Sequence, residues 1–219
     1  MTPYATRAGS AWARLQDGNA RWANDRSSAA GARGASRRAE VTSGQSPFAL
    51  ILGCSDSRVP AEILFDQGIG DLFVVRTAGH VVDAGVLGSV EYAVEILGVS
   101  LLIVLGHNEC GAVKAATDIV DDGKVPPGYI RDVAERIAPN VLRARVAGAT
   151  TGDEIAGQHA RYTLELLRQR STLLDDAVRR GTVSTVPAQY SLDTGIVTAV
   201  RPPIDLTDPA GPVPVLARA

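Results

Sequence analysis

Residues 48–58 read Phe-Ala-Leu-Ile-Leu-Gly-Cys-Ser-Asp-Ser-Arg, an apolar run that ends in glycine and leads directly into a polar, cysteine-containing motif. The same arrangement recurs at residues 101–110, where Leu-Leu-Ile-Val-Leu-Gly is followed by His-Asn-Glu-Cys. Continuous apolar runs of this length, separated by helical segments, are typical of strands buried in a parallel sheet. Both runs therefore predict an α/β protein with reactive side chains at the ends of two strands.

Strands and helices are predicted to alternate along most of the chain. The predicted strands are Phe48–Leu52, Asp71–Val75, Leu101–Leu105, Val183–Ser191 and Gly195–Val200, the last two joined as an antiparallel hairpin by Asp193-Thr194-Gly195. Apolar spacing predicts helices that begin near Pro60, at Asp83 as an N-cap and after Cys110, and helices over Pro126–Ala147 and Asp153–Arg180 with a break near Ser171. This order predicts a central, mostly parallel sheet flanked by helices.

The two ends of the chain differ from its centre. Ser10–Arg26 is predicted to be an amphipathic helix that carries Trp12 and Trp22 on one face, and Ser27–Gln45 is predicted to be a linker with one weak helix. The tail, residues 202–219, is rich in proline and is expected to be poorly ordered. Residues 1–219 are thus expected to form a single domain, in which residues 1–45 are an N-terminal helical arm and linker.

Composition limits the class of protein. The net charge is −2 and the basic residues are scattered, which argues against a nucleic-acid-binding surface. No apolar stretch approaches the ~20 residues needed to cross a bilayer, and the N-terminal segment lacks the apolar core of a secretory signal. We therefore expect a cytoplasmic protein without a membrane partner. In that reducing compartment its two cysteines are metal ligands or free thiols rather than a disulfide.

The two polar motifs together contain the ligand set of a tetrahedral zinc site, namely two thiols, an imidazole and a carboxylate. These groups belong to Cys54, Asp56, His107 and Cys110. Ligands of open α/β sheets bind beyond the carboxyl ends of the strands, so the motifs meet if their strands are neighbours. Either motif alone is weak, because an isolated buried cysteine is usually inert. Both together favour a metal site, and sulfur and nitrogen ligands favour zinc over magnesium or calcium.

The motif at the first strand also contains Arg58, two residues beyond Asp56. A guanidinium can hold a carboxylate through two parallel hydrogen bonds, so Asp56 has an alternative to the metal as its partner. Departure of Asp56 would open a coordination position to water, which indicates a catalytic rather than a structural zinc site. The alternative for Arg58 is an ordinary surface charge.

The paired motifs resemble those of the β-class carbonic anhydrases. The resemblance rests on Cys54-Ser55-Asp56-Ser57-Arg58-Val59-Pro60 and Gly106-His107-Asn108-Glu109-Cys110-Gly111-Ala112, and it extends to residues 15–22, 71–80 and 190–195. It implies one Zn2+ per subunit with Cys54, His107 and Cys110 as permanent ligands. Asp56 would then be the fourth ligand in a closed form and the partner of Arg58 in the active form.

The resemblance also implies reversible hydration of carbon dioxide to bicarbonate and a proton. In carbonic anhydrases with three histidine ligands, zinc lowers the pKa of its bound water to ≈ 7. The family implies the same zinc-hydroxide attack on CO2 from a different ligand set. Asp56 would orient the hydroxide, and Arg58 would keep that carboxylate ionised and off the metal.

Further site residues follow from the resemblance alone. The substrate pocket would be lined by Gln45, Phe73, Ala78, Tyr92 and the backbone N–H of Gly111. Phe73 and Tyr92 are alternatively ordinary core aromatics. Gln45 would enter the site from a neighbouring subunit, which implies a homodimer or homotetramer. The N-terminal helices would then cross between subunits and place both tryptophans on a neighbour, whereas helical periodicity alone places them on the core of their own subunit.

Some positions depart from the family pattern. Arg76 and Tyr190 match two residues of a regulatory bicarbonate site, but Ile51 replaces its tryptophan, so that regulation is not expected. His80 replaces a frequent asparagine and is open to either a proton-relay or a structural role. His159 has no evident role. Two other functions stay open, a related zinc hydrolase acting on carbon disulfide or carbonyl sulfide, and a non-catalytic zinc domain.

Overall fold

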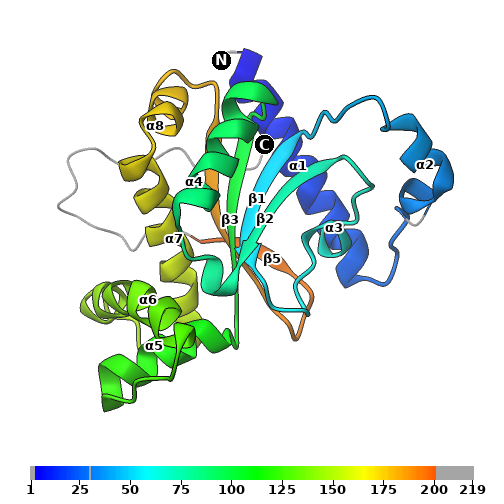
Figure 1. Ribbon diagram of the computed structural model, residues 1–219. Coiled ribbons are helices and arrows are strands. Elements are labelled where there is room, and N and C mark those ends of the chain that lie inside the picture. The colour runs from blue at the N-terminus through cyan, green and yellow to red at the C-terminus, as the bar shows by residue number, and fades with distance from the viewer. Residues whose placement is uncertain (1–2, 30, 201–219) are drawn as a thin grey trace.

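The computed structural model describes residues 3–29 and 31–200, and in this part of the chain the strands form a five-stranded sheet of order β2-β1-β3-β4-β5 (Figure 1). The strands are β1 (Ala49–Cys54), β2 (Leu72–Thr77), β3 (Leu101–His107), β4 (Ser184–Tyr190) and β5 (Val197–Ala199). The first four are mutually parallel, and β5 pairs antiparallel with β4. The predicted α/β class, with its mostly parallel sheet and C-terminal hairpin, is confirmed.

Most helices lie where apolar spacing and capping residues predict them. The longer ones are α1 (Pro3–Ala23), α4 (Ala84–Glu91), α5 (Gly111–Asp122), α6 (Tyr129–Val146), α7 (Gly152–Arg170) and α8 (Thr172–Arg179), and the short ones are η1 (Gly31–Arg33), α2 (Ala35–Glu40), α3 (Ala61–Leu64), η2 (Ala78–His80) and η3 (Tyr92–Ile96). Asp83 is the N-cap of α4, since its carboxylate accepts a hydrogen bond from the Val86 N–H. The predicted break at Ser171 is confirmed, because the Ser171 hydroxyl caps α8 by accepting from the Leu174 N–H.

Several boundaries differ from the prediction. Helix α1 begins at Pro3 rather than Ser10, and proline is well suited to a first helical turn because it has no N–H to satisfy there. The helix that follows Pro60 is a single turn, and the helix capped by Asp83 changes to a π-helical turn at Tyr92. The predicted poorly ordered tail, 202–219, lies outside the described residues. Among the described helices, none is long and apolar enough to cross a membrane.

The sheet is covered on both faces, as a parallel sheet with buried central strands requires. Helices α1 and α3 cover one face, and α4, η3, α7 and α8 cover the other (Figure 1). Helices α5 and α6 pack together beyond the carboxyl end of β3, and their buried side chains surround both cysteines. The buried side chains of α5 and α6 place the cysteines in apolar surroundings that shield them from bulk water.

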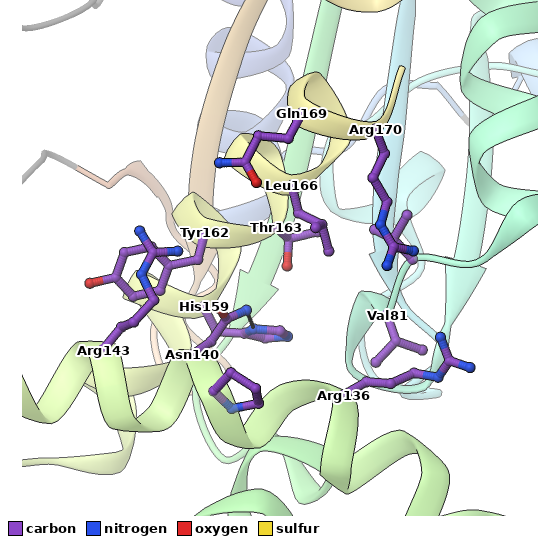
Figure 2. A pocket seen from close by; sticks show the side chains of 12 residues that line it. Val81, Arg136, Asn140, Arg143, His159, Tyr162, Thr163, Leu166, Gln169 and Arg170 are labelled. Carbon is purple, nitrogen blue, oxygen red and sulfur yellow. Dashed lines mark hydrogen bonds between the residues drawn. The ribbon is translucent and has the colours of Figure 1, made fainter. Parts of the chain in front are cut away.

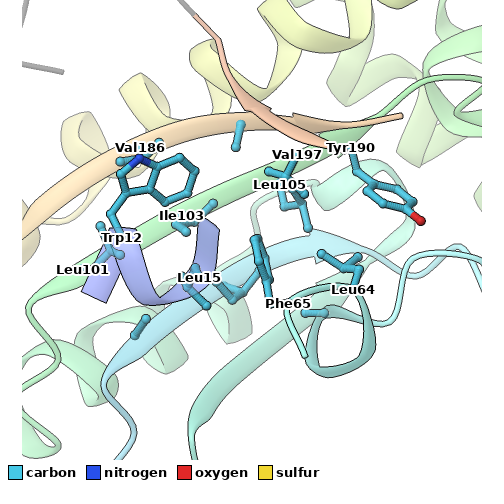
Figure 3. Packing of buried hydrophobic residues seen from close by; sticks show 14 of the residues in the cluster. Trp12, Leu15, Leu64, Phe65, Leu101, Ile103, Leu105, Val186, Tyr190 and Val197 are labelled. Carbon is cyan, nitrogen blue, oxygen red and sulfur yellow. The ribbon is translucent and has the colours of Figure 1, made fainter. Parts of the chain in front are cut away.

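The first tryptophan packs within its own chain, contrary to the placement on a neighbouring subunit that the family resemblance implied. Trp12 is 5% exposed and lies in the cluster that contains Leu15, Leu101 and Val186 (Figure 3). Trp22 packs half-buried against the same cluster. The reason is that the apolar face of α1 has an apolar sheet face of the same subunit available to bury it, as helical periodicity predicted.

A buried carboxylate joins the N-terminal arm to the rest of the domain. Asp66 follows α3 in a left-handed conformation (φ 48°), and its side chain is fully buried. It accepts hydrogen bonds from Arg21 Nε at 2.6 Å, from the Ser28 N–H at 3.0 Å and from the Ala29 N–H at 2.9 Å. Burial raises the pKa of Asp66, but the hydrogen bonds from Ser28, Arg21 and Ala29 outweigh burial and lower it to about 2.

We expect Asp66→Asn to lower the free energy of unfolding by about 2 kcal/mol at neutral pH, because an amide keeps the size and left-handed backbone but not the charge. The folded-state pKa lies below the unfolded value, so this stabilisation is present at neutral pH and is lost as the pH falls from about 4 to about 2. Urea denaturation of both proteins at pH values from about 7 to about 3 should therefore show the difference shrinking on acidification.

The matched control is Asp25→Asn, since Asp25 is also left-handed (φ 54°) but exposed. We expect it to change stability by less than about 0.5 kcal/mol. Equal losses in the two variants, or a loss at Asp66 that does not change with pH, would show that the charge of Asp66 is not what holds the arm.

Candidate metal centre

Two neighbouring strands bring the two polar motifs together. Strands β1 and β3 pair in parallel, with Gly53 opposite Leu105, so Cys54 at the end of β1 lies beside the end of β3, where His107 stands. Cys110 follows as the N-cap residue of α5. The candidate ligand atoms of Cys54, His107 and Cys110 all lie within 4.8 Å of one another, and the two sulfur atoms are 4.0 Å apart. The structure thus forms a compact group of two sulfurs and one imidazole.

The histidine of this group is oriented as a metal ligand. His107 Nδ1 lies 2.7 Å from the Asn108 carbonyl oxygen, and since a carbonyl can only accept, Nδ1 carries the proton. Nε2 then presents its lone pair to the two cysteines. Among the buried side-chain nitrogen and oxygen atoms of the described residues, His107 Nε2 is the one that lacks a hydrogen-bond partner. A buried acceptor left unpaired among thiols fits a metal ion, and backbone hydrogen bonding of the second ring nitrogen is the usual arrangement of a ligating histidine.

The two thiols differ in acidity. The pKa of Cys54 is lowered to about 4, chiefly by a hydrogen bond from the Cys110 thiol and further by the backbone N–H groups of Asp56 and Gly79. The same contact with Cys54 raises the pKa of Cys110, because the thiolate of Cys54 holds the proton there. A metal cation in this position would displace the proton of Cys110 and bind two thiolates.

The carboxylate predicted as a fourth ligand is held by its arginine. Asp56 accepts hydrogen bonds from Arg58 Nε at 3.0 Å and from Arg58 Nη2 at 2.8 Å, the bidentate geometry expected of this pair. The side-chain hydrogen bond from Arg58 is the main reason why the pKa of Asp56 falls to about 2. One carboxylate oxygen lies 3.9 Å from His107 Nε2, so Asp56 faces the ligand group without belonging to it.

Two further side chains hold the loops that carry these residues. Arg76, at the end of β2, donates to the Cys54 carbonyl at 2.9 Å and to the Asp56 carbonyl at 2.6 Å. The Asn108 side chain accepts from the Leu192 N–H at 2.7 Å and donates to Asp193 at 2.9 Å. Sequence reasoning gave Asn108 no role and considered Arg76 only for regulation. The parallel register that sets Arg76 beside Gly53 is the structural signal for its role in the loop.

The residues of the regulatory pattern also have partners within this chain. Ile51 is fully buried in the core of β1. The Tyr190 hydroxyl lies 3.1 Å from Trp22 Nε1, which donates to it. Together with the backbone hydrogen bonds of Arg76, these contacts give all three positions partners within this chain.

The residues expected around the substrate occupy several elements. Gly111 is the exposed first residue of α5, directly after Cys110, where the backbone N–H groups have no partner within the helix. Ala78 is exposed directly after β2. The Phe73 and Tyr92 rings are 6.2 Å apart, with Phe73 half-buried against the core and Tyr92 45% exposed. Gln45 is exposed in the segment before β1. Of these residues, Gly111 is the one adjacent in sequence to a ligand.

A cavity of about 270 Å³ lies between α6 and α7, and none of its lining residues belongs to the cysteine–histidine group (Figure 2). Its wall includes His159, a residue for which sequence reasoning found no role. His159 stacks on His80, and both rings are buried. Burial lowers the pKa of His80 well below its ordinary value, and its Nδ1 lies 3.3 Å from the Thr163 hydroxyl. A neutral, enclosed His80 agrees with the structural alternative rather than with a proton relay.

Comparison with known proteins relates this chain to carbonic anhydrases. The sequence model of the carbonic anhydrase family matches residues 49–197, which contain all the ligand candidates. A carbonic anhydrase of Mycolicibacterium smegmatis is 50% identical over 187 residues, which cover 85% of this chain and 90% of that protein. Carbonic anhydrase 2 of Mycobacterium tuberculosis is 48% identical over 185 residues, which cover 84% of this chain and 89% of that protein.

Solved structures share the same architecture. The β-carbonic anhydrase of Coccomyxa in complex with acetazolamide superposes with a TM-score of 0.68 at 27% identity, covering 87% of this chain and 86% of that one. The β-carbonic anhydrase CcaA gives a TM-score of 0.62 at 26% identity, covering 75% of this chain and 84% of that one. With its family match, its relatives and its Cys–His–Cys group in agreement, this chain belongs to the β-class carbonic anhydrase family.

Proposed function

We propose that this protein catalyses the reversible hydration of carbon dioxide to bicarbonate and a proton, with one zinc ion per subunit held by Cys54, His107 and Cys110. The observation that carries the proposal is the unpaired His107 Nε2 between two sulfurs, next to a carboxylate that an arginine holds aside. The relatives at 48–50% identity are carbonic anhydrases by name, which supports the same reaction here.

Each residue of the site has a separate role in the proposed reaction. Zinc bound to this ligand set would lower the pKa of a water molecule toward neutrality, which makes a nucleophile for CO2 available. Asp56, ionised at any physiological pH, would accept a hydrogen bond from that water and orient it toward the substrate. Arg58 keeps the carboxylate turned away from the ligand group, and the Gly111 N–H would donate to a substrate oxygen.

We also propose that the enzyme is a homodimer or homotetramer in which Gln45 reaches the neighbouring subunit's site. Strand β2 forms an edge of the sheet, and Tyr92 and Ile96, 45% and 67% exposed, leave apolar surface near it for a second copy. Two β-carbonic anhydrases from Sordaria macrospora, which share this fold, are described as tetrameric. Phe73, Ala78 and Tyr92 would line the substrate pocket at that interface. We propose a cytoplasmic location, where both cysteines stay reduced.

Carbon dioxide hydration is best tested by stopped-flow assays across pH with zinc content measured on the same sample. We expect about one zinc per subunit and activity that rises through neutral pH, because the nucleophile requires deprotonated water. Full zinc occupancy without hydration at about pH 8.5 would instead indicate the non-catalytic zinc domain. Hydrolysis of carbon disulfide or carbonyl sulfide by the same sample, in place of CO2 hydration, would indicate the related hydrolase.

We expect Asp56→Asn to lower kcat by roughly 100-fold or more while zinc content is retained, because the amide cannot act as the charged acceptor that orients water. Zinc analysis and stopped-flow kinetics on one preparation measure both effects. Asp118→Asn, which removes an exposed carboxylate paired with Lys114, is the matched control and should leave both values unchanged. Loss of the metal from Asp56→Asn would mean that Asp56 is an obligatory ligand.

We expect Arg58→Ala to convert the site to its closed form, because the Asp56 carboxylate loses both guanidinium hydrogen bonds while it remains close to His107 Nε2. Activity should fall, and a crystal structure of the zinc-loaded variant should show a carboxylate oxygen of Asp56 on the metal in place of water. Arg136→Ala, which breaks a comparable exposed pair with Asp132, is the control and should change neither. Unchanged activity in Arg58→Ala would exclude the Asp56–Arg58 dyad.

A further inference from the structure

A strained turn follows β2 and contacts the metal centre. Gly79 and His80 are consecutive residues in the left-handed region, with φ of 58° and 43°. Glycine adopts this conformation freely, but for a histidine it is uncommon and persists only where the surroundings hold it. Such strain is concentrated at functional sites, so the contacts of this turn show what it does.

The turn delivers a hydrogen bond to a ligand candidate. The Gly79 N–H donates to Cys54 Sγ, with the nitrogen 3.3 Å from the sulfur. A Cβ atom at Gly79 would lie 2.6 Å from Ile137 Cδ1 and 2.9 Å from Ala112 Cβ, so the backbone is wedged against α5 and α6. The direction of this N–H therefore depends on how the whole turn is held.

His159, on α7, holds the turn from the opposite side. Its Nε2 lies 2.9 Å from the Gly79 carbonyl oxygen, and since a carbonyl only accepts, Nε2 must carry the proton. Its Nδ1 then accepts from Asn140 Nδ2 at 2.9 Å, so Asn140 fixes the tautomer (Figure 2). Burial lowers the pKa of His159 to about 4, which agrees with a neutral ring.

The same ring also supports the second residue of the turn. The His159 and His80 rings stack with centroids 4.4 Å apart and planes inclined by 19°. The Thr163 hydroxyl, one helical turn further along α7, lies 3.3 Å from His80 Nδ1. One helix face therefore restrains both left-handed residues, with His159 in contact with each of them.

Polar contacts set the orientation of the His159 side chain. His159 lines the cavity of about 270 Å³ between α6 and α7 but is itself buried (Figure 2). Its orientation is set by its two hydrogen bonds and the stack with His80. An apolar side chain of similar size at position 159 could fill the same space, but it could not form the hydrogen bonds that hold the turn.

We propose that His159 is a positioning residue of the metal centre, which locks the Gly79–His80 turn so that the Gly79 N–H remains directed at the Cys54 sulfur. The inference rests on the proposed function in one respect, that Cys54 binds the metal. An N–H donated to a metal-bound thiolate withdraws electron density from the sulfur and fixes its position, and outer contacts of this kind tune both metal affinity and electronic structure.

The test uses two properties of the loaded protein that do not depend on turnover. The zinc dissociation rate is measured with an excess of chromophoric chelator, and the sulfur-to-metal charge-transfer band is recorded on the cobalt-substituted protein. His159→Leu removes both hydrogen bonds, whereas His159→Gln retains a donor near the position of Nε2. Leu167→Ala is the control for general destabilisation of α7, because Leu167 is fully buried but does not belong to the apolar cluster that surrounds the cysteines.

We expect His159→Leu to release zinc about 10-fold faster than the wild type, because the Cys54 sulfur is no longer fixed in position. The cobalt band should shift to longer wavelength, because the thiolate loses its hydrogen-bond donor. His159→Gln should restore most of both values, and Leu167→Ala should leave the band unchanged. If His159→Leu does not fold, Asn140→Leu weakens the same link from α6 and should change both properties in the same direction.

Two outcomes would overturn the inference. An unchanged band and zinc release rate in His159→Leu, or in Asn140→Leu where the first does not fold, would exclude a positioning role although the wild type binds metal. Equal band shifts in Leu167→Ala and His159→Leu would assign the effect to general loosening of α7. A wild-type protein that binds neither zinc nor cobalt would overturn the proposed function itself, so the two failures are distinguishable.

Discussion

The parallel pairing of β1 with β3 is the constraint on which the metal centre depends. Because the strands run in the same direction and in register, their carboxyl ends coincide and bring Cys54 beside His107, fifty-three positions further along the chain. Both strands are buried along their whole length, so a register shift would expose apolar side chains as well as separate the ligands. The stability of the core and the geometry of the site therefore have a common cause.

Around this pairing, contacts from other elements hold the two motifs. Arg76 of β2 binds the Cys54 and Asp56 carbonyls of the first motif, and Asn108 connects the second motif to the C-terminal hairpin. Gly79 contacts the Cys54 sulfur, and His159 of α7 contacts Gly79. Every strand end near the site thus contributes to its rigidity, which a metal centre requires because ligand positions must be fixed before the ion binds.

The sequence was sufficient where local patterns decide the outcome. The strands are continuous apolar runs, and the break at Ser171 follows from a capping side chain. Helical periodicity placed Trp12 correctly, whereas the family resemblance did not. His159 was not predictable in the same way. Its small neighbours Ala156 and Ala160 indicate a buried helix face, but its partner is a carbonyl eighty positions away, and only the tertiary fold brings the two together.

The different burial of the site residues fits the proposed division into three fixed ligands and one exchangeable ligand. The side chains of Cys54, His107 and Cys110 are almost fully enclosed, where a bound cation has little competition from water. Asp56 and Arg58 lie at the border, with side chains 17% and 53% exposed. Deep burial would bind the carboxylate to one partner permanently, and full exposure would screen it from both. At the border, Asp56 binds the guanidinium directly and keeps one oxygen 3.9 Å from His107 Nε2, so both proposed partners are close to it.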